Sequence, residues 1–314
     1  MEHKYFSGVD IAKSTFVVGF THKKSTEKFK NNLEGFEKFK EAYQDILNET
    51  LIVLETTGRY EWAFLKFLVK NGYSVHRAHA ARVKSYMKSL GQRGKTDPAD
   101  AKALAQYAQE RRDTLTIFKI PDEILEQLNI LSHRKFDVKK MIHQEKNRLK
   151  SPENDIIKDS IEALLTSLEE VLNQIQIKID LIFKENEVLS AKLCAAIEIP
   201  GIAEETGKML ISLIPELGTL TKAKIASLVG VAPHPKDSGA HSGYRSIPKG
   251  REEAKRTLYL SSMAASKSKS PLGDFYRGLK ARGKKPKVAL VALMRKILII
   301  LNAKIRDNCY EKII

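Results

Sequence analysis

The sequence predicts an α/β amino-terminal region, a long helical middle and a mainly helical carboxyl-terminal region. Through residue 112, short β-rich runs alternate with amphipathic stretches of helical length, which is typical of an α/β fold. Residues 122–198 are charged, periodic in leucine and isoleucine and free of glycine, which indicates long helices. Glycine and proline return after this stretch, so we expect three segments, at residues 1–115, 120–195 and 196–314.

The first segment is predicted to hold five short strands bounded by turn residues, at 5–12, 14–20, 25–31, 51–58 and 73–78. Apolar residues at helical spacing predict helices at 33–47, 60–72 and 81–90, with another after Asp97. This order matches the ribonuclease H-like (RuvC-like) fold, in which the first three strands form an antiparallel meander within a mixed sheet that has helices on both faces. Periodicity alone leaves a doubly wound sheet open.

The middle segment is predicted to be an antiparallel helical hairpin or coiled coil. Two charged, leucine- and isoleucine-periodic runs cover residues 123–150 and 161–193, and Pro152 marks a turn between them. Such an element would separate the two ends of the chain and offer a dimerisation surface. A plain packed helical subdomain is the alternative. Beyond it, helices are predicted at residues 252–268 and 287–305, with a basic linker between them.

The charge of the chain indicates a polyanionic partner. There are 54 Lys and Arg against 38 Asp and Glu, which gives a formal net charge of +16. From Lys236 onward, 19 Lys and Arg stand against 6 Asp and Glu, so this segment carries +13 of that total. A basic segment beside a nearly balanced remainder is typical of a nucleic-acid-binding surface, with simple solubility as the alternative.

Other features narrow the setting of the protein. The sequence contains no run of 18 apolar residues, so no membrane span is expected. The start, MEHKYFSGVDIAKS, has no apolar signal-peptide core. Cys194 and Cys309 lie far apart without metal-ligand spacing, so a disulfide framework is not expected. We therefore expect a cytoplasmic protein that does not act at a membrane.

Two aspartates open the last helix of the first segment. Asp97 and Asp100 are three residues apart in GQRGKTDPADAKALAQYA. Helix capping is the simpler interpretation, with Asp97 as the N-cap, Pro98 at the first helical position and Asp100 at the third. Both carboxylates would then lie near the positive end of the helix dipole. Taken alone, the motif favours capping.

Two further acids lie at predicted strand ends. Asp10 ends the first strand in GVDIAKS, and Glu55 ends the fourth in LIVLETTG. In a ribonuclease H-like sheet these strands are neighbours, and the helix with Asp97 and Asp100 crosses over them. Four carboxylates in one cleft repel one another unless a hard cation binds them through oxygen, and Mg²⁺ is the obvious candidate. The sequence therefore predicts a magnesium site suited to phosphoryl transfer.

These motifs resemble those of a known family. Asp10 in GVDIAKS, Glu55 in LETTGRY, and Asp97 with Asp100 in RGKTDPADAKALA are similar to the DEDD transposases of the IS110/IS1111 insertion-sequence group, related to the Piv/MooV-like recombinases. The stretches IEIPGIAEETGKMLISLIPELG and LVGVAPHPKDSGAHSGYRSIPKGREEAKRTLYLSSMAA resemble the carboxyl-terminal transposase domain of that family. The resemblance covers essentially the whole chain.

The resemblance implies a serine nucleophile in the loop APHPKDSGAHSGYR. Ser238 falls at the position of the family's serine, Ser242 is a second choice, and Tyr244 is a less favoured alternative. Attack by serine would leave a phosphoserine link to DNA that conserves the bond energy for rejoining. The resemblance further implies donor and target DNA, a guiding noncoding RNA, and a homodimer or tetramer in which serine and carboxylates can meet between protomers.

The main interpretation is therefore a Mg²⁺-dependent recombinase of an insertion sequence, guided by a bridge RNA. A RuvC-like Holliday-junction resolvase or nuclease that hydrolyses DNA with water is one alternative. A non-catalytic nucleic-acid-binding protein is another. Removal of the Ser238 hydroxyl separates the two enzymes, because a water-using nuclease would continue to cut DNA. Removal of the Asp10 carboxylate tests the third interpretation, which predicts no effect.

Overall fold

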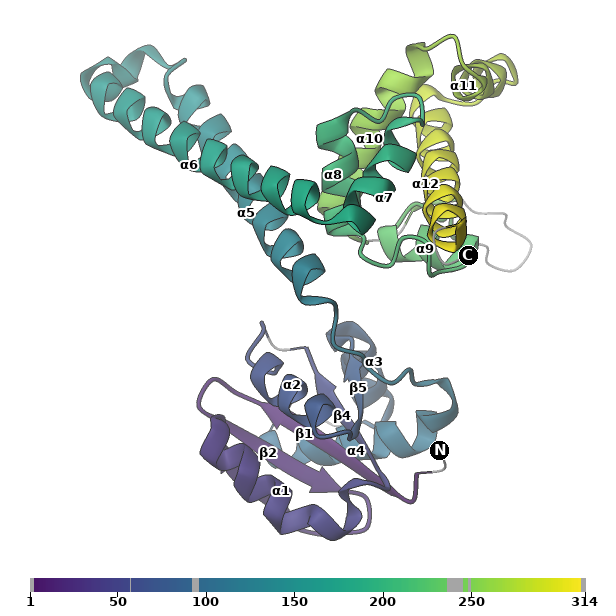
Figure 1. Cartoon of the computed structure of the whole chain (residues 1–314). Coiled ribbons are helices and arrows are strands. Elements are labelled where there is room, and N and C mark those ends of the chain that lie inside the picture. The colour runs from purple at the N-terminus through teal and green to yellow at the C-terminus, as the bar shows by residue number, and fades with distance from the viewer. Residues whose placement is uncertain (1–2, 57, 92–95, 236–244, 248–249, 312–314) are drawn as a thin grey trace. The chain divides into compact units, whose positions relative to one another are not determined.

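The computed structural model describes residues 3–56, 58–91, 96–235, 245–247 and 250–311 (Figure 1). The chain divides into two units, Met1–Pro121 and Asp122–Ile314. The first unit combines a sheet with helices, and the second is built from helices. The predicted change from α/β to helical structure is confirmed.

A mixed sheet of five strands forms the centre of the first unit. Its strands are β1 (Tyr5–Ile11), β2 (Thr15–Phe20), β3 (Thr26–Lys30), β4 (Thr50–Glu55) and β5 (Ser74–Ala78). The strand order is β3-β2-β1-β4-β5. Strand β2 pairs antiparallel with β1 and β3, whereas β4 lies parallel to both β1 and β5. The antiparallel meander and the mixed sheet predicted from the sequence are confirmed.

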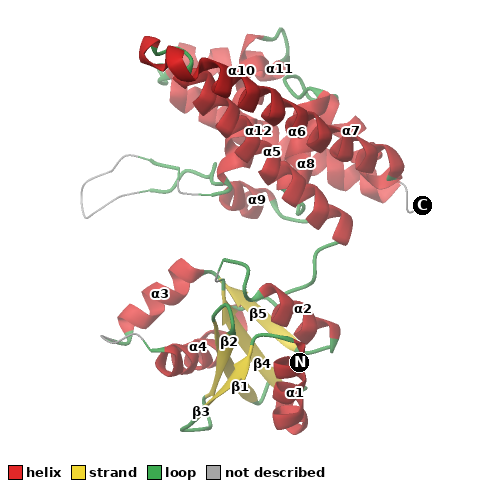
Figure 2. Ribbon diagram, turned by 90° about the vertical axis from the view of Figure 1, so that its left-hand side faces the viewer, coloured by secondary structure: helices red, strands yellow, loops and turns green. Residues whose placement is uncertain are grey.

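Helices cover both faces of this sheet (Figure 2). The helices of the first unit are α1 (Leu33–Leu47), α2 (Trp62–Lys70), α3 (Ala80–Ser89) and α4 (Asp97–Arg111), followed by the short η1 (Arg112–Thr114). Side chains of α1 and α2 form one apolar core with one face of the sheet. Side chains of α3 and α4 form a second apolar core with the opposite face. Because successive side chains of a strand point to opposite faces, neighbouring positions pack against different pairs of helices.

Two long helices form an antiparallel hairpin at the start of the second unit. These are α5 (Glu123–Arg148) and α6 (Lys158–Glu185), joined through η2 (Pro152–Ile157), and Figure 1 shows them running side by side. The helix predicted over 161–193 is interrupted, because Asn186 leaves the helical conformation and caps α7 (Glu187–Ile197), accepting a hydrogen bond from the Leu189 amide at 3.0 Å. The hairpin is as predicted, while its role in dimerisation stays a prediction.

The remaining helices pack into one core with the base of the hairpin. They are α8 (Glu204–Leu213), α9 (Lys222–Val229), α10 (Glu252–Lys267), α11 (Pro271–Ala281) and α12 (Pro286–Glu311). Helix α11 was not predicted, and its last residues overlap the stretch at 277–287 that was predicted as a basic linker. Its start follows ordinary capping rules, since Ser270 accepts from the Gly273 amide and Pro271 occupies the first turn. Among the described residues, no helix has the length and apolar character needed to cross a membrane.

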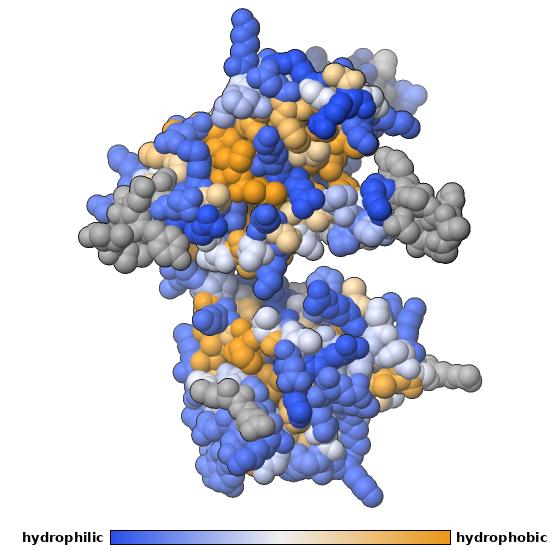
Figure 3. All heavy atoms as spheres, turned by 90° about the vertical axis from the view of Figure 1, so that its right-hand side faces the viewer, coloured by the Kyte–Doolittle hydropathy of each residue, from blue (hydrophilic) through white to orange (hydrophobic). Residues whose placement is uncertain are grey.

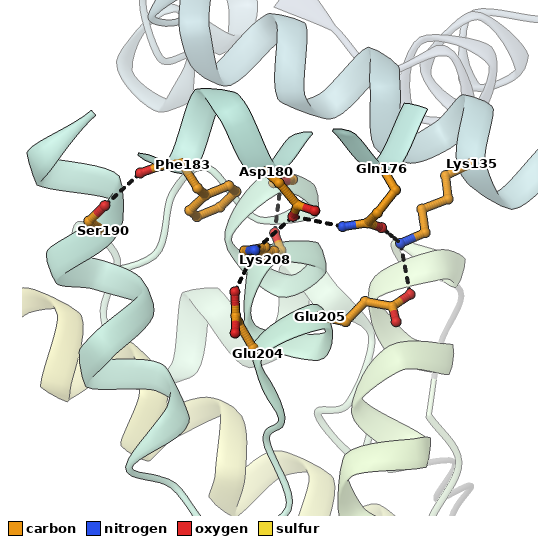
Figure 4. A network of polar contacts seen from close by, with 9 residues as sticks. Lys135, Gln176, Asp180, Phe183, Ser190, Glu204, Glu205 and Lys208 are labelled. Carbon is orange, nitrogen blue, oxygen red and sulfur yellow. Dashed lines mark hydrogen bonds and ion pairs between the residues drawn. The ribbon is translucent and has the colours of Figure 1, made fainter. Parts of the chain in front are cut away.

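Charged side chains are buried where the hairpin meets α8 (Figure 4). Lys135 of α5 is 3% exposed and donates hydrogen bonds to Gln176 of α6 and, at 2.7 Å, to Glu205 of α8. Lys208 of α8 donates to Asp180 of α6 at 2.7 Å. Because a buried ammonium group without a partner is costly, these bonds specify how α5, α6 and α8 meet.

The ion pair of Glu205 predicts a pH-dependent contribution to stability. Hydrogen bonding from Lys135 lowers the pKa of the Glu205 carboxyl from 4.5 to about 2. The contribution is therefore complete above pH 4.5 and is lost as the pH falls towards 2. We expect Glu205→Gln to lower the melting temperature at neutral pH, with a difference from the parent that shrinks through this window. Thermal melts across pH test this, with Glu170→Gln, at an exposed position on α6, as the matched control.

Candidate active site

Asp10 and Glu55 lie at the same edge of the sheet. The last parallel pair between β1 and β4 joins Val9 to Leu54, so the two acids follow at the next position of neighbouring strands. Each is half-buried. Because the strands are parallel, both carboxylates belong to the carboxyl-terminal edge of the sheet, which is where α/β folds commonly bind ligands.

The two acids also share a face of the sheet. Leu51 and Val53 of β4 pack with α3 and α4, whereas Leu54 packs with α1 and α2. Alternation therefore places Glu55 on the α3/α4 face. Phe6 packs on that same face, and Asp10, four residues further along β1, shares it. The structure thus brings the two predicted strand-end acids to one edge and one face.

Helix α4 crosses this face in direct contact with the backbone of β1. A Cβ atom at Gly8 would lie 2.1 Å from the carbonyl oxygen of Ala101 and 2.5 Å from the Cβ of Leu104. Later turns of α4 pack beside Phe6, near the start of β1. The first turn of α4 is therefore directed towards the strand ends. Asp100 in that turn is 6% exposed, which indicates that it lies against the sheet.

The predicted N-cap of α4 is wrong by one residue. Thr96 has the extended conformation of an N-cap, with φ −141° and ψ 142°, and its hydroxyl accepts from the Ala99 amide at 3.4 Å. Asp97 is already the first helical residue and is exposed, and Pro98 is the second. Threonine and aspartate are both good N-caps, so the sequence alone did not separate them. The correction removes the capping role that competed with a functional role for Asp97.

The donor atoms at this edge fit a hard divalent cation. They are carboxylate oxygens, which Mg²⁺ prefers over nitrogen or sulfur. Among the residues that the structure describes, no three or more His, Cys, Asp or Glu side chains are already gathered as metal ligands. The backbone places Asp10 and Glu55 on neighbouring strands, on the face of the sheet that α4 crosses.

A buried ion pair anchors the segment that follows Glu55. Gly58 and Arg59 adopt positive φ values of 58° and 81° before the chain enters α2. Glu61, which is fully buried, accepts a hydrogen bond of 2.6 Å from Arg77 of β5. Sequence reasoning missed this pair, because a glutamate in YEWAFL resembles an ordinary acid in the first turn of a helix. The ion pair therefore holds the segment that follows β4 against β5.

Ser238 and Ser242, the predicted nucleophile and its second choice, lie outside the described residues, and so does Tyr244. The flanks of their loop are described. His234 and Ser246 form an antiparallel bridge, with N–O distances of 2.9 and 3.3 Å between their backbones. The loop therefore leaves and rejoins the second unit at adjacent points.

Two family profiles match the chain in order. A DEDD-type profile of IS110, described as a transposase, matches residues 7–152. A second profile, described as a transposase of the IS116/IS110/IS902 family, matches residues 195–277. The first match contains all four predicted acids, and the second contains both predicted serines.

Similar proteins agree with these matches. The pilin gene-inverting proteins of Moraxella lacunata and Moraxella bovis are each 26% identical over 314 residues, covering 97% of this chain and 97% of their own. An uncharacterized protein of insertion element IS110 from Streptomyces coelicolor is 30% identical over 159 residues, covering 50% of this chain and 38% of its own. With both profiles matched and gene-inverting relatives aligned almost from end to end, the chain belongs to the IS110 family of transposases and is a DNA-recombining enzyme.

Proposed function

We propose that this transposase is a Mg²⁺-dependent recombinase of an insertion sequence that exchanges DNA strands through a covalent serine–DNA intermediate. One observation carries the proposal. Asp10 and Glu55 lie near the carboxyl ends of neighbouring parallel strands on the face covered by α4, and the first turn of α4 contains Asp97 and Asp100. The order and directions of the strands support a ribonuclease H-like fold for the first unit.

In this proposal the four acids hold Mg²⁺ at the edge of the sheet. When bound, the divalent cation stabilises the charge that develops on phosphate oxygens during phosphoryl transfer. The chain presents oxygen ligands from two strand ends and one helical turn, so regular secondary structure rather than a long loop determines their spacing. Backbone amides at the start of α4 offset part of the negative charge of Asp97 and Asp100.

In the same proposal, Ser238 supplies the nucleophile of the cleavage step. Its Oγ loses a proton and bonds to the phosphorus of the scissile phosphodiester, while the bond from phosphorus to the deoxyribose oxygen breaks. The leaving strand takes up a proton and ends in a hydroxyl group. Attack by a hydroxyl of another strand then restores a phosphodiester and releases the serine. Because the bond energy is kept in the phosphoserine link, this chemistry suits exchange better than hydrolysis.

The proposal assigns a task to each segment of the chain. Residues 1–115 carry the acids, residues 120–195 support oligomerisation, and residues 196–314 carry Ser238 and bind nucleic acid. The +13 charge from Lys236 onward supports the last assignment. A homodimer or tetramer would let serine and acids from different protomers meet, and a noncoding RNA paired with donor and target DNA would select the sites.

Covalent trapping tests the serine chemistry. The full-length protein is incubated with Mg²⁺, the noncoding RNA of its insertion sequence and end-labelled DNA that carries the ends of that element, and the mixture is resolved on a denaturing gel. We expect a labelled protein–DNA adduct with the parent and with Ser242→Ala, and no adduct with Ser238→Ala. Mass spectrometry of the digested adduct should place the nucleotide on Ser238.

Two results would contradict this assignment. If Ser238→Ala cuts DNA as fast as the parent, the enzyme is a water-using nuclease. If the nucleotide maps to Ser242 or Tyr244, the nucleophile has been assigned to the wrong residue.

A further inference from the structure

A broad groove opens beside the base of the loop that carries Ser238. It has a volume of about 800 Å³ and lies between the loop flanks, α11 and α12. Pro233 lines it from the flank before the loop, and Ser246 and Ile247 line it from the flank after the loop. Figure 3 shows apolar residues gathered on the surface of the second unit, between hydrophilic ones. The volume is within the range of pockets that bury an organic ligand of moderate size.

The groove exists because α12 is apolar on more than one face. Leu293 and Ile297 are buried in the core of the unit. A second apolar stripe includes Val288, which is 40% exposed, and Val291 and Ile299, which are partly exposed. These three positions share one side of the helix at helical spacing, and they form the floor of the groove. An exposed apolar stripe of this kind is typical of a surface that binds a partner.

The rim of the groove is cationic. Arg245, Lys287, Arg295 and Lys296 line it, and none of the lining residues that the structure describes is acidic. Lys296 is held over the ring of Phe275, 4.1 Å from the ring centroid. An occupant must therefore combine an apolar body with negative charge.

Single-stranded DNA has this combination. Its bases present apolar faces that can pack on the valine and isoleucine floor and on Phe275, and its phosphates carry one negative charge each. Grooves that bind single strands likewise combine cationic side chains with apolar contacts to the bases. A second copy of the same segment fits poorly, because each copy carries +13 from Lys236 onward and the two would repel. Charge complementarity thus favours DNA over self-association.

We propose that the groove receives unstacked bases of a single DNA strand while the four cations bind its phosphates. The inference deepens the proposed function, since the groove adjoins the two flanks of the Ser238 loop and would hold the strand that the loop acts on. An unstacked base at this place implies that the duplex opens locally next to the site of cleavage. The groove is then the part of the enzyme that prefers distorted over regular duplex DNA.

Binding measurements with abasic DNA test this directly. The probes are a short labelled single strand and the same strand with its bases removed at several positions, both measured without divalent cation on full-length Ser238→Ala protein. We expect removal of bases to weaken binding about tenfold, since stacked bases contribute substantially to such complexes. In the Ile299→Asn background the two probes should bind with the same affinity. Val288→Asn places the polar side chain at a position that is 40% exposed, so it should keep the fold and behave like Ile299→Asn.

The control is Ile177→Asn, which changes a 57% exposed isoleucine on α6 and should leave the tenfold difference intact. Equal affinity of the Ser238→Ala protein for both DNA probes would overturn the proposal. A matched pair of RNA probes is measured in parallel, and a dependence on bases seen only in the RNA pair would also overturn it. A change of oligomeric state in Ile299→Asn by sedimentation would also overturn it, because the groove would then be an interface between copies. No cleavage occurs in this assay, so failure of the serine mechanism would leave its result unchanged.

Discussion

Glu55→Gln is expected to reduce recombination about a thousandfold while the protein stays folded. The substitution keeps the size of the side chain and removes one negative charge at the end of β4. In the proposed site, loss of a charged ligand would weaken the binding of Mg²⁺ and so remove electrostatic stabilisation of the transition state. The fold should not suffer, because fewer like charges remain at the edge of the sheet. Excision and insertion of a marked element in cells measure the effect.

Glu49→Gln provides the matched control for this experiment. Glu49 directly precedes the first residue of β4 and forms an ion pair with Lys4 at 2.7 Å, with its side chain 45% exposed. Recombination by this variant should equal that of the parent. A melting temperature that rises with Mg²⁺ in the parent but not in Glu55→Gln would link the loss to metal binding. Wild-type recombination by Glu55→Gln would show that the acids are not the catalytic site.

Gly8→Ala is expected to damage both stability and activity. The added Cβ atom would lie 2.1 Å from the carbonyl oxygen of Ala101 and 2.3 Å from the amide nitrogen of Ala105. Both are backbone atoms of α4, so the helix must shift as a body. Overpacking of this kind costs about 3 kcal/mol of the free energy of unfolding. In addition to this loss of stability, a shift of Asp97 and Asp100 by about 1 Å would lower the activity of the folded protein about a hundredfold.

Gly278→Ala is the control for the glycine substitution. Gly278 lies inside α11, and a Cβ atom there would meet nothing within 4 Å. The change should be neutral or stabilising by about 1 kcal/mol, because alanine favours the helix over glycine. Urea denaturation followed by circular dichroism compares the two variants. Unchanged stability of Gly8→Ala would mean that α4 does not lie on β1 as closely as described.

The sheet was predictable from the sequence because strand patterns are local and the order of elements restricts the topology. Helix boundaries were less predictable. Thr96 and Asp97 are both suitable N-caps, and only the backbone angles of Thr96 decide between them. Asn186 interrupts a run that is otherwise periodic. The interruption could not be predicted, because one asparagine costs little within a helix and does not by itself indicate a break. Helix α11 was not predicted because the basic residues around it indicated a linker, although Ser270 and Pro271 form an ordinary capping signal at its start.

The candidate site likewise combines features that the sequence predicts with features that it does not. The placement of Asp10 beside Glu55 follows from strand order, which the sequence predicted. The close contact at Gly8 and the buried pair of Glu61 with Arg77 depend on packing between distant segments. A glycine in a strand and a glutamate near a helix start have many ordinary explanations. Periodicity therefore gave no signal for either feature.

The buried lysines at the foot of the α5–α6 hairpin have a mechanical consequence. Directional bonds from Lys135 to Gln176 and Glu205 resist sliding between helices more than an apolar seam would. From Lys135 to the end of α5 at Arg148, the hairpin extends about 20 Å at 1.5 Å per residue. A tilt of about 15° at this foot would displace the tip by about 5 Å. The bonds at its foot thus hold the direction of the hairpin relative to α8, and a small change of angle there is magnified at the tip.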